Sequence, residues 1–172
     1  MLSQLEKECY LRHIMLEDVG EEGQLKLLKS SVLVVGAGGL GSAVLMYLCT
    51  ARINDACVLA KKPYSHAGVL KYRGQSMSVL PHSACLACVF DKPPKKGLNP
   101  ISGLFGVLPG VLGCIQASEC LKYFLGFETL LINTLLIADI KTMDFKKIQA
   151  PKNPECRVCG THKITHLQDY EI

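Results

Sequence analysis

The order of hydrophobic and polar positions predicts a chain that mixes helices and strands. The first segment, residues 11–30, holds a candidate amphipathic helix at residues 20–29. Residues 31–35 form a continuous apolar run rich in β-branched side chains, which is typical of a strand buried on both faces. Residues 42–62 contain neither Gly nor Pro, and apolar positions recur there at helical spacing. They predict one helix of up to about five turns that ends at Pro63.

The second half of the chain continues the alternation. Residues 67–80 predict a strand in which Gly74 marks a bulge or turn. Residues 103–125 predict an apolar helix with Gly126 as its C-cap residue. A helix that is apolar almost all round is buried, either in its own core or in a dimer interface.

Two further strands and a polar tail complete the expected domain. The strands are expected at 130–140 and 143–148, and no repeat or low-complexity tract interrupts the chain. We therefore predict one domain with four successive segments: an N-terminal helical arm (1–30), a glycine-rich strand–turn–helix (31–62), the sheet with the apolar helix (63–150), and a tail (151–172).

Composition places the chain among proteins with a real hydrophobic core. Of its 172 residues, 49% are hydrophobic and 20% are charged, which excludes wholesale disorder. The formal net charge is only +4, and no basic block appears, so nucleic acid is not an expected partner. The most apolar run, 104–115, is too short to span a bilayer. The N-terminus is polar and shows no signal peptide, so we expect a soluble cytoplasmic protein without a membrane partner.

A glycine-rich turn is the first candidate site. Gly36, Gly38 and Gly41 form a Gly-x-Gly-x-x-Gly pattern, and Gly39 adds a fourth glycine. The pattern follows an expected strand and opens an expected helix, which is the context of a dinucleotide-binding fingerprint. Glycines let backbone N–H groups approach a phosphate, and a helix N-terminus adds partial positive charge. The turn predicts a nucleotide-phosphate site. The alternative is a turn that needs glycines only for close packing.

The usual second part of a dinucleotide site is missing. An acid about 20 residues further on normally binds the ribose hydroxyls. That region holds Lys61, Lys62 and Pro63, and the nearest acid, Asp55, falls inside the expected helix. No apolar strand stands between residues 42 and 63. We therefore expect an incomplete parallel sheet, and an NAD-dependent oxidoreductase becomes the least favoured interpretation.

Two cysteine pairs form the second candidate site. Cys85 and Cys88 make one Cys-x-x-Cys pair, and Cys156 and Cys159 make another. Each pair can place two thiolates in a knuckle loop, and two knuckles complete a tetrahedral zinc site. In a reducing compartment such pairs bind metal more often than they form disulfides. We predict a structural zinc ion that ties the tail to the middle of the chain. Thioredoxin-like redox pairs and unrelated buried cysteines are the alternatives.

The remaining candidates have ordinary structural interpretations. Five other cysteines fall mostly in apolar helical runs and are expected to be small core residues: Cys9, Cys49, Cys57, Cys114 and Cys120. Asp139 ends an apolar strand, which favours a role in a turn. Arg12 has no local structural task, and composition alone makes it a solvated arginine.

Several segments together match the pattern of one known family. They are residues 10–16, 20–24, 33–42 and 53–60, the Gly74–Gln75 pair, both cysteine pairs, and residues 106–111, 116–119 and 154–160. On these residues the chain resembles the MoeB/ThiF/HesA family, the bacterial relatives of ubiquitin-activating enzymes. The resemblance covers nearly the whole chain, and the motifs together are highly specific.

The resemblance implies a fold, an activity and partners. It implies a Rossmann-like α/β fold and a homodimer to which the long apolar helix contributes. With Mg-ATP, such enzymes adenylylate the C-terminal glycine of a ubiquitin-like sulfur-carrier protein for molybdopterin or thiamine synthesis. The four glycines of the turn would cradle ATP, Arg12 would reach the partner subunit's ATP site, and the four paired cysteines would hold zinc.

The chain also departs from the family pattern. Between about residues 51 and 53 it lacks the family's second strand with the ribose-binding acid, the arginine finger, a phosphate-binding lysine and the magnesium-binding aspartate. No catalytic residue is therefore assigned. We expect an internally truncated α/β protein of the ThiF type, an adenylyltransferase by resemblance, that catalyses poorly on its own. The alternatives are a non-catalytic dimerisation or carrier-binding module, and a deletion product without selected function.

Overall fold

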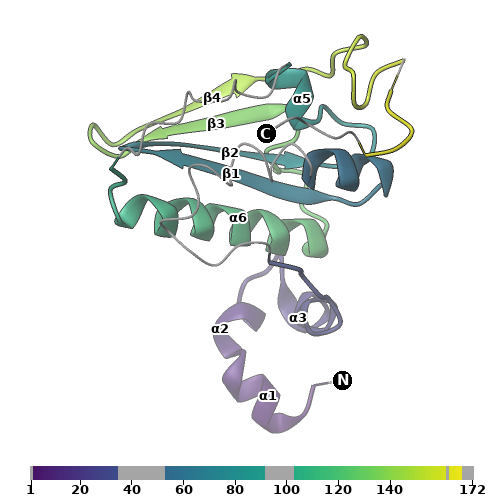
Figure 1. Ribbon diagram of the computed structural model, residues 1–172. Coiled ribbons are helices and arrows are strands. Elements are labelled where there is room, and N and C mark those ends of the chain that lie inside the picture. The colour runs from purple at the N-terminus through teal and green to yellow at the C-terminus, as the bar shows by residue number, and fades with distance from the viewer. Residues whose placement is uncertain (1, 35–52, 92–102, 162, 168–172) are drawn as a thin grey trace.

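A four-stranded sheet is the centre of the computed structural model, which describes residues 2–34, 53–91, 103–161 and 163–167 (Figure 1). The strands lie side by side in chain order: β1 (Tyr64–Leu70), β2 (Arg73–Val79), β3 (Thr134–Asp139) and β4 (Asp144–Gln149). The helices are α1 (Gln4–Cys9), α2 (Leu11–Ile14), α3 (Gly20–Leu28), α5 (Leu86–Val89) and α6 (Val107–Leu125), and residues 53–59 are also helical.

The pairing of the strands shows that the expected parallel sheet is wrong for this part of the chain. Every neighbouring pair in the sheet is antiparallel. β1 and β2, like β3 and β4, are joined by turns far too short for the crossover that parallel strands need. The single strand expected over 67–80 is part of the first hairpin. Its turn is made by Lys71, which adopts a positive φ of 54°, and not by Gly74, which lies inside β2.

The apolar run before the glycine-rich turn is not a buried strand where the structure describes it. Residues 31–34 have no regular structure, and Leu33 is 86% exposed. A strand with two apolar faces needs neighbours to cover them, and the described sheet offers none at this run. Val35 and the turn itself lie outside the described residues. Of the helix expected over 42–62, residues 53–59 are helical and residues 42–52 lie outside the described part.

The two faces of the sheet are covered by different parts of the chain. α6 runs along one face and packs against β1 and β2 (Figure 1). The buried residues between α6 and this face, which we call the helix face, are Val69, Leu108, Leu112 and Ala138. The opposite face, which we call the cysteine face, carries a larger cluster of buried residues: Met77, Val79, Ala84, Cys85, Ala87, Leu135, Ala150, Cys156 and Val158. Alternation of side chains along each strand separates the two sets.

Helix α6 confirms the helix expected over residues 103–125, but it is buried on one side only. It ends at Leu125, and Gly126 follows as the left-handed C-cap residue, with φ of 81°. One side of α6 is buried through Leu108 and Leu112. The other side is exposed within the described chain. Gly74 is needed here because a Cβ atom on it would lie 3.0 Å from Leu112 Cδ2.

The N-terminal arm lies beyond α6, away from the sheet (Figure 1). The helix expected at residues 20–29 is confirmed as α3. α1 and α2 precede it, and α1 begins with a capping box between Ser3 and Glu6. α3 contacts α6 so closely that a Cβ atom on Gly23 would lie 2.9 Å from Leu125. Among the described helices, none combines the length and the apolar character needed to cross a membrane.

The expected strands of the second hairpin are confirmed. β3 begins later than expected, at Thr134, and β4 matches closely. Asp139 ends β3 in the expected turn role, since its Oδ1 accepts a hydrogen bond from Lys141 N at 3.1 Å. Its other carboxylate oxygen receives Arg73 Nε at 2.9 Å across the strand pair.

Candidate metal centre

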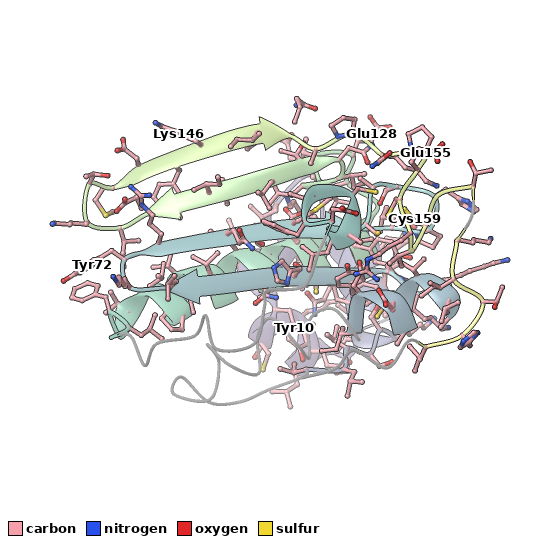
Figure 2. The ribbon with its side chains drawn as sticks, turned by 45° about the horizontal axis from the view of Figure 1, so that its top comes forward. Tyr10, Tyr72, Glu128, Lys146, Glu155 and Cys159 are labelled. Carbon is pink, nitrogen blue, oxygen red and sulfur yellow. The ribbon has the colours of Figure 1, made fainter. Side chains whose placement is uncertain are left out.

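The four paired cysteines meet at one end of the cysteine face. Cys85 precedes α5, Cys88 lies within it, and the tail brings Cys156 and Cys159 to the same place. All four sulfur atoms lie within 4.8 Å of one another. Figure 2 shows Cys159 in the tail, at the end of the sheet where α5 lies. Cysteines 71 positions apart are thus brought together by the fold.

Each cysteine pair is held in a tight knuckle by its own backbone. Cys88 N donates to Cys85 O at 2.9 Å, and Gly160 N donates to Cys156 O at 2.8 Å. Gly160 has no room for a side chain, because a Cβ atom on it would lie 2.7 Å from Cys156 N and collide with Pro154 O. In addition, Asn153 N donates to Cys88 Sγ at 3.4 Å. Such N–H···S bonds orient and stabilise thiolate ligands.

The spacing of the sulfur atoms fits a tetrahedral metal ion. Cys88 Sγ lies 3.4 Å from Cys159 Sγ, and Cys85 Sγ lies 3.7 Å from Cys156 Sγ. Four sulfurs at a Zn–S distance of about 2.3 Å would lie about 3.8 Å apart. A set of four soft thiolates is the donor set of zinc or iron–sulfur sites. The residues present therefore fit a closed, structural zinc site.

The pKa values of the thiols are shifted because the four groups lie close together in a partly buried place. Hydrogen bonds, first of all from Cys85, lower the pKa of Cys159 to about 5, and the pKa of Cys85 is raised correspondingly. Burial raises the pKa of Cys88 to about 11. Without a cation, one thiolate would thus be stabilised by its protonated neighbours. A divalent cation would favour the ionised form of all four.

A buried polar network joins the first knuckle to the helical residues 53–59. Asn54 Oδ1 accepts hydrogen bonds from Tyr64 Oη at 2.6 Å and from Leu86 N at 2.9 Å. Asn54 Nδ2 donates to Asp55 Oδ1 at 2.9 Å. Both Asn54 and Asp55 are buried. Because buried polar groups must be paired, this network fixes the helical residues against the start of α5.

Arg157 extends the same network to the tail. Its Nη1 lies 3.8 Å from Asp55 Oδ2, and its Nε donates to Asp91 O at 3.1 Å. Since Arg157 stands between the two cysteines of the second knuckle, the tail is fixed to residues 53–59 and to the end of α5 at once. The cysteine cluster is therefore the point where three separate chain segments meet.

Among the other predicted binding residues, the structure describes only Arg12, and it does not lie at the cysteine cluster. Gly36, Gly38, Gly39 and Gly41 lie outside the described residues. Arg12 lies in α2, exposed, on the far side of α6 from the cysteine face (Figure 1). Residues 8–13 line an open surface hollow there. Beside it, His13 Nδ1 lies 3.1 Å from Gln24 Oε1.

Four of the remaining cysteines do not occupy the core positions that the sequence predicts. Cys9 and Cys114 are exposed, and Cys57 and Cys120 are only partly buried. Cys114 lies on the outer side of α6, where the helix faces away from the sheet. Cys49 lies outside the described residues. The apolar sequence around these cysteines therefore did not indicate burial.

Glu119 is a structural residue that the sequence did not single out. It lies on α6, and its Oε2 accepts hydrogen bonds from Ser78 Oγ and Leu131 N, each at 2.6 Å. Lys122 forms an ion pair with its other oxygen. Burial alone would raise the pKa of Glu119, but these bonds outweigh burial and lower it. The only signal in the sequence was a lone carboxylate within an apolar helix.

The chain matches a known family over most of its length. A sequence model described as the ThiF family matches residues 10–53 and 50–158. The SAMP-activating enzyme E1 of Haloferax volcanii is 27% identical over 248 aligned positions, which cover 94% of this chain and 92% of that protein. The sulfur carrier protein adenylyltransferase of Thermus thermophilus is 28% identical over 260 positions and covers 96% of both chains.

A solved structure shares the fold. The microcin C7 biosynthetic enzyme MccB, in complex with N-formylated MccA, superposes with a TM-score of 0.55 at 20% identity, over 63% of this chain. This chain spans only 36% of MccB. The expected ThiF-type fold is confirmed to that extent. Because the family model matches more than half of the residues, this chain belongs to the ThiF family.

Proposed function

We propose that this chain serves the ATP-dependent adenylylation of the C-terminal glycine of a ubiquitin-like sulfur carrier, and that it catalyses this step poorly on its own. Its relatives are named adenylyltransferases and activating enzymes, which supports the reaction class. The observation that supports weak catalysis is the family match, which consists of two segments that meet at residues 50–53. An alignment of 248 positions also exceeds the 172 residues of the chain, so the relative has residues without a counterpart here.

The physical reason for weak catalysis is the loss of charge partners. Adenylyl transfer depends on positioning ATP and neutralising its phosphates. By the family resemblance, the arginine finger, the lysine and the magnesium-binding aspartate would fall at the junction, where this chain has none of them. Each missing electrostatic contact of this kind costs about 2–4 kcal/mol of transition-state stabilisation. The turn glycines could still hold phosphate, and Mg-ATP remains the proposed cosubstrate.

A carrier-dependent ATP–pyrophosphate exchange assay tests this proposal. The purified chain is compared with the Thermus thermophilus relative, each with the same carrier and saturating Mg-ATP. We expect exchange by this chain to be slower by at least about 100-fold, which corresponds to a loss of one such contact. Equal rates per molecule would overturn the proposal of weak catalysis.

We also propose that Cys85, Cys88, Cys156 and Cys159 bind one structural zinc ion. The support is the close approach of the four sulfurs and their two backbone knuckles. A thiolate site of this kind requires reduced cysteines, which suits a cytoplasmic protein. When bound, zinc would supply charge neutralisation and a covalent-like tie for the tail. The chain's own residues hold the geometry: the knuckle amides, Asn153 N and the Arg157 network.

A homodimer through α6 is the proposed assembly. The exposed side of α6 forms an apolar stripe at helical spacing: Val107, Gly110, Cys114, Ala117 and Leu121. Small residues along this stripe would let a second copy of the helix approach closely, and a two-fold axis makes the same patch face itself. We expect Leu121→Asp to shift the sedimenting species from dimer to monomer. Glu128→Lys, an exposed change beyond the helix, is the matched control.

A non-catalytic carrier-binding module is the second candidate function. It is favoured by the described residues, among which the sheet, α6 and the cysteine cluster are all present although the chain lacks the missing segment. Carrier binding measured by calorimetry without ATP separates the candidates. Micromolar affinity without pyrophosphate exchange supports the module. Neither binding nor exchange would leave only the alternative of a deletion product.

A further inference from the structure

Two contacts between sulfur atoms of the cluster, for which the distances are short, cross from one knuckle to the other. The closer pair is Cys88 and Cys159, at 3.4 Å, and the second is Cys85 and Cys156, at 3.7 Å. Both pairs join α5 or its cap to the tail. A disulfide requires an S–S distance of about 2.05 Å, so the closer pair needs to move by little more than 1 Å.

The two pairs differ in their access to solvent. Cys88 and Cys159 are partly buried, whereas Cys85 and Cys156 are 0% and 2% exposed. A small reagent in water therefore meets the closer pair first. The shorter of these two contacts is thus also the more exposed one, and it joins different knuckles.

We propose that this cluster is a site of oxidative modification in which Cys88 and Cys159 form a disulfide, with a hydroperoxide as the oxidant. One thiolate sulfur attacks a peroxide oxygen, the O–O bond breaks, and a sulfenic acid and one water form. The second thiolate attacks the sulfenic sulfur, the S–O bond breaks, and a second water leaves as the S–S bond forms. Two electrons from the sulfurs reduce one hydrogen peroxide, and solvent supplies the two protons that the thiolates lack.

The modification changes how the tail is held. The S–S bond would remove Cys88 and Cys159 as ligands, so the cluster would no longer hold a metal ion with four thiolates and release of the ion is expected. The tail nevertheless stays attached, because the new bond joins Cys88 in α5 to Cys159 in the tail. Removal of metal by a chelator, in contrast, leaves the tail without either tie. This inference goes beyond the proposed adenylylation and does not depend on it.

Peptide mapping after mild oxidation tests the proposal directly. The full chain is treated with one equivalent of hydrogen peroxide, digested without reduction and analysed by mass spectrometry, while released zinc is measured with a chromogenic chelator. We expect a loss of two hydrogens, a linked peptide joining Cys88 to Cys159, and release of the bound zinc, all reversed by dithiothreitol. A Cys9→Ser chain serves as the matched control, because it lacks an exposed cysteine outside the cluster and should give the same map.

Other outcomes of this experiment would overturn the proposal. They are a disulfide within one knuckle, a sulfinic acid without any disulfide, or retention of zinc after peroxide has been consumed. Tryptic cleavage of the tail supplies a second measurement that needs no cysteine variant within the cluster. Oxidised, zinc-free chain should be cleaved in the tail more slowly than chelated, reduced chain. Equal cleavage of the two forms would contradict the proposed tie.

Discussion

The two faces of the sheet are stabilised in different ways. On the helix face, Leu108 and Leu112 of α6 pack on the strands, and Glu119 adds a buried, fully paired carboxylate. On the cysteine face, the covering segments are the short helix α5 and a tail without helix or strand at residues 151–161, which meets the sheet through Cys156 and Val158. One face is covered by a long helix, whereas the other is covered by a short helix and an irregular tail that meet at a thiol cluster.

This difference indicates that the cysteine face needs more than side-chain packing for its stability. An irregular segment pays ordering entropy without the compensation of a helix or strand ladder. The tail offsets that cost with the knuckles, the Arg157 network and the proposed metal ion. We therefore expect the cysteine face to depend on metal and the helix face to be independent of it.

Replacing a knuckle cysteine should have the largest effect and should be confined to one face. Cys156→Ser removes a buried ligand, so we expect loss of zinc, rapid proteolysis of the tail and destabilisation by about 4 kcal/mol or more. Metal analysis and urea unfolding measure these effects. Cys9→Ser, which changes an exposed cysteine outside the cluster, is the matched control and should leave both values unchanged. Full zinc content in Cys156→Ser would contradict a four-thiolate site.

Glu119→Ala tests the helix face in the same way. The change leaves Leu131 N and Ser78 Oγ without their acceptor and Lys122 without its ion-pair partner. We expect a loss of about 3 kcal/mol in the free energy of unfolding, because the groups left behind are buried or partly buried. Zinc content should stay at the wild-type value, which distinguishes this change from Cys156→Ser. Glu128→Ala is exposed and should cost almost nothing. Zinc loss in Glu119→Ala would show that the faces are coupled.

His66 should make the cysteine face sensitive to acid. It lies on β1 beside Met77, and its Nε2 has no hydrogen-bond partner within the described structure. Burial lowers the pKa of His66 from about 6.5 to about 4, so the folded chain holds it neutral. Between pH 6.5 and 4 the unfolded chain takes up this proton first. The free energy of unfolding is therefore expected to fall by about 3 kcal/mol as the pH is lowered from 6.5 to 4. Above pH 6.5, His66 is neutral in both states and causes no such loss.

Unfolding measured between pH 7 and 4 in His66→Leu checks this prediction. The variant should lose that part of the pH dependence, whereas His166→Gln, at an exposed position, should keep it. An unchanged slope in His66→Leu would mean that His66 does not titrate as its burial indicates.

Gly74→Ala should have the smallest of these effects. The new Cβ atom would lie 3.0 Å from Leu112 Cδ2 and 3.2 Å from Gly68 O, so α6 must shift slightly. We expect a cost of about 2 kcal/mol, measured by thermal unfolding, with zinc content unchanged. Leu112→Ala in the same chain should recover part of the cost of Gly74→Ala. Gly113→Ala, which lies on α6 outside the proposed dimer stripe and where the added Cβ meets nothing within 4 Å, should be neutral or slightly stabilising.

The sequence predicted those features whose signals are local. The pattern of α6 and its Gly126 cap, the second hairpin and the turn at Asp139 were all recognisable from neighbouring residues. The cysteine spacing likewise indicated that the tail returns to α5, and the four sulfurs do meet. Regular periodicity and paired ligands are the two signals that a single sequence carries well.

Features that depend on tertiary context were missed. The first hairpin turns at Lys71 without a glycine, so no turn residue marked it. The apolar run at residues 31–34 looked like a buried strand, yet burial depends on neighbours that the described sheet does not supply. The roles of Glu119 and His66 arise only from what packs around them. A single sequence does not show which polar residue will be enclosed.

Hydrogen exchange before and after removal of metal tests the central claim most directly. The purified chain is first assayed for zinc, and amide exchange is then followed with and without a strong chelator under reducing conditions. We predict one zinc per chain, and loss of protection on chelation in α5 and the tail while α6 keeps its protection. Chain that holds no zinc, or that loses protection equally over both faces of the sheet, would contradict the account.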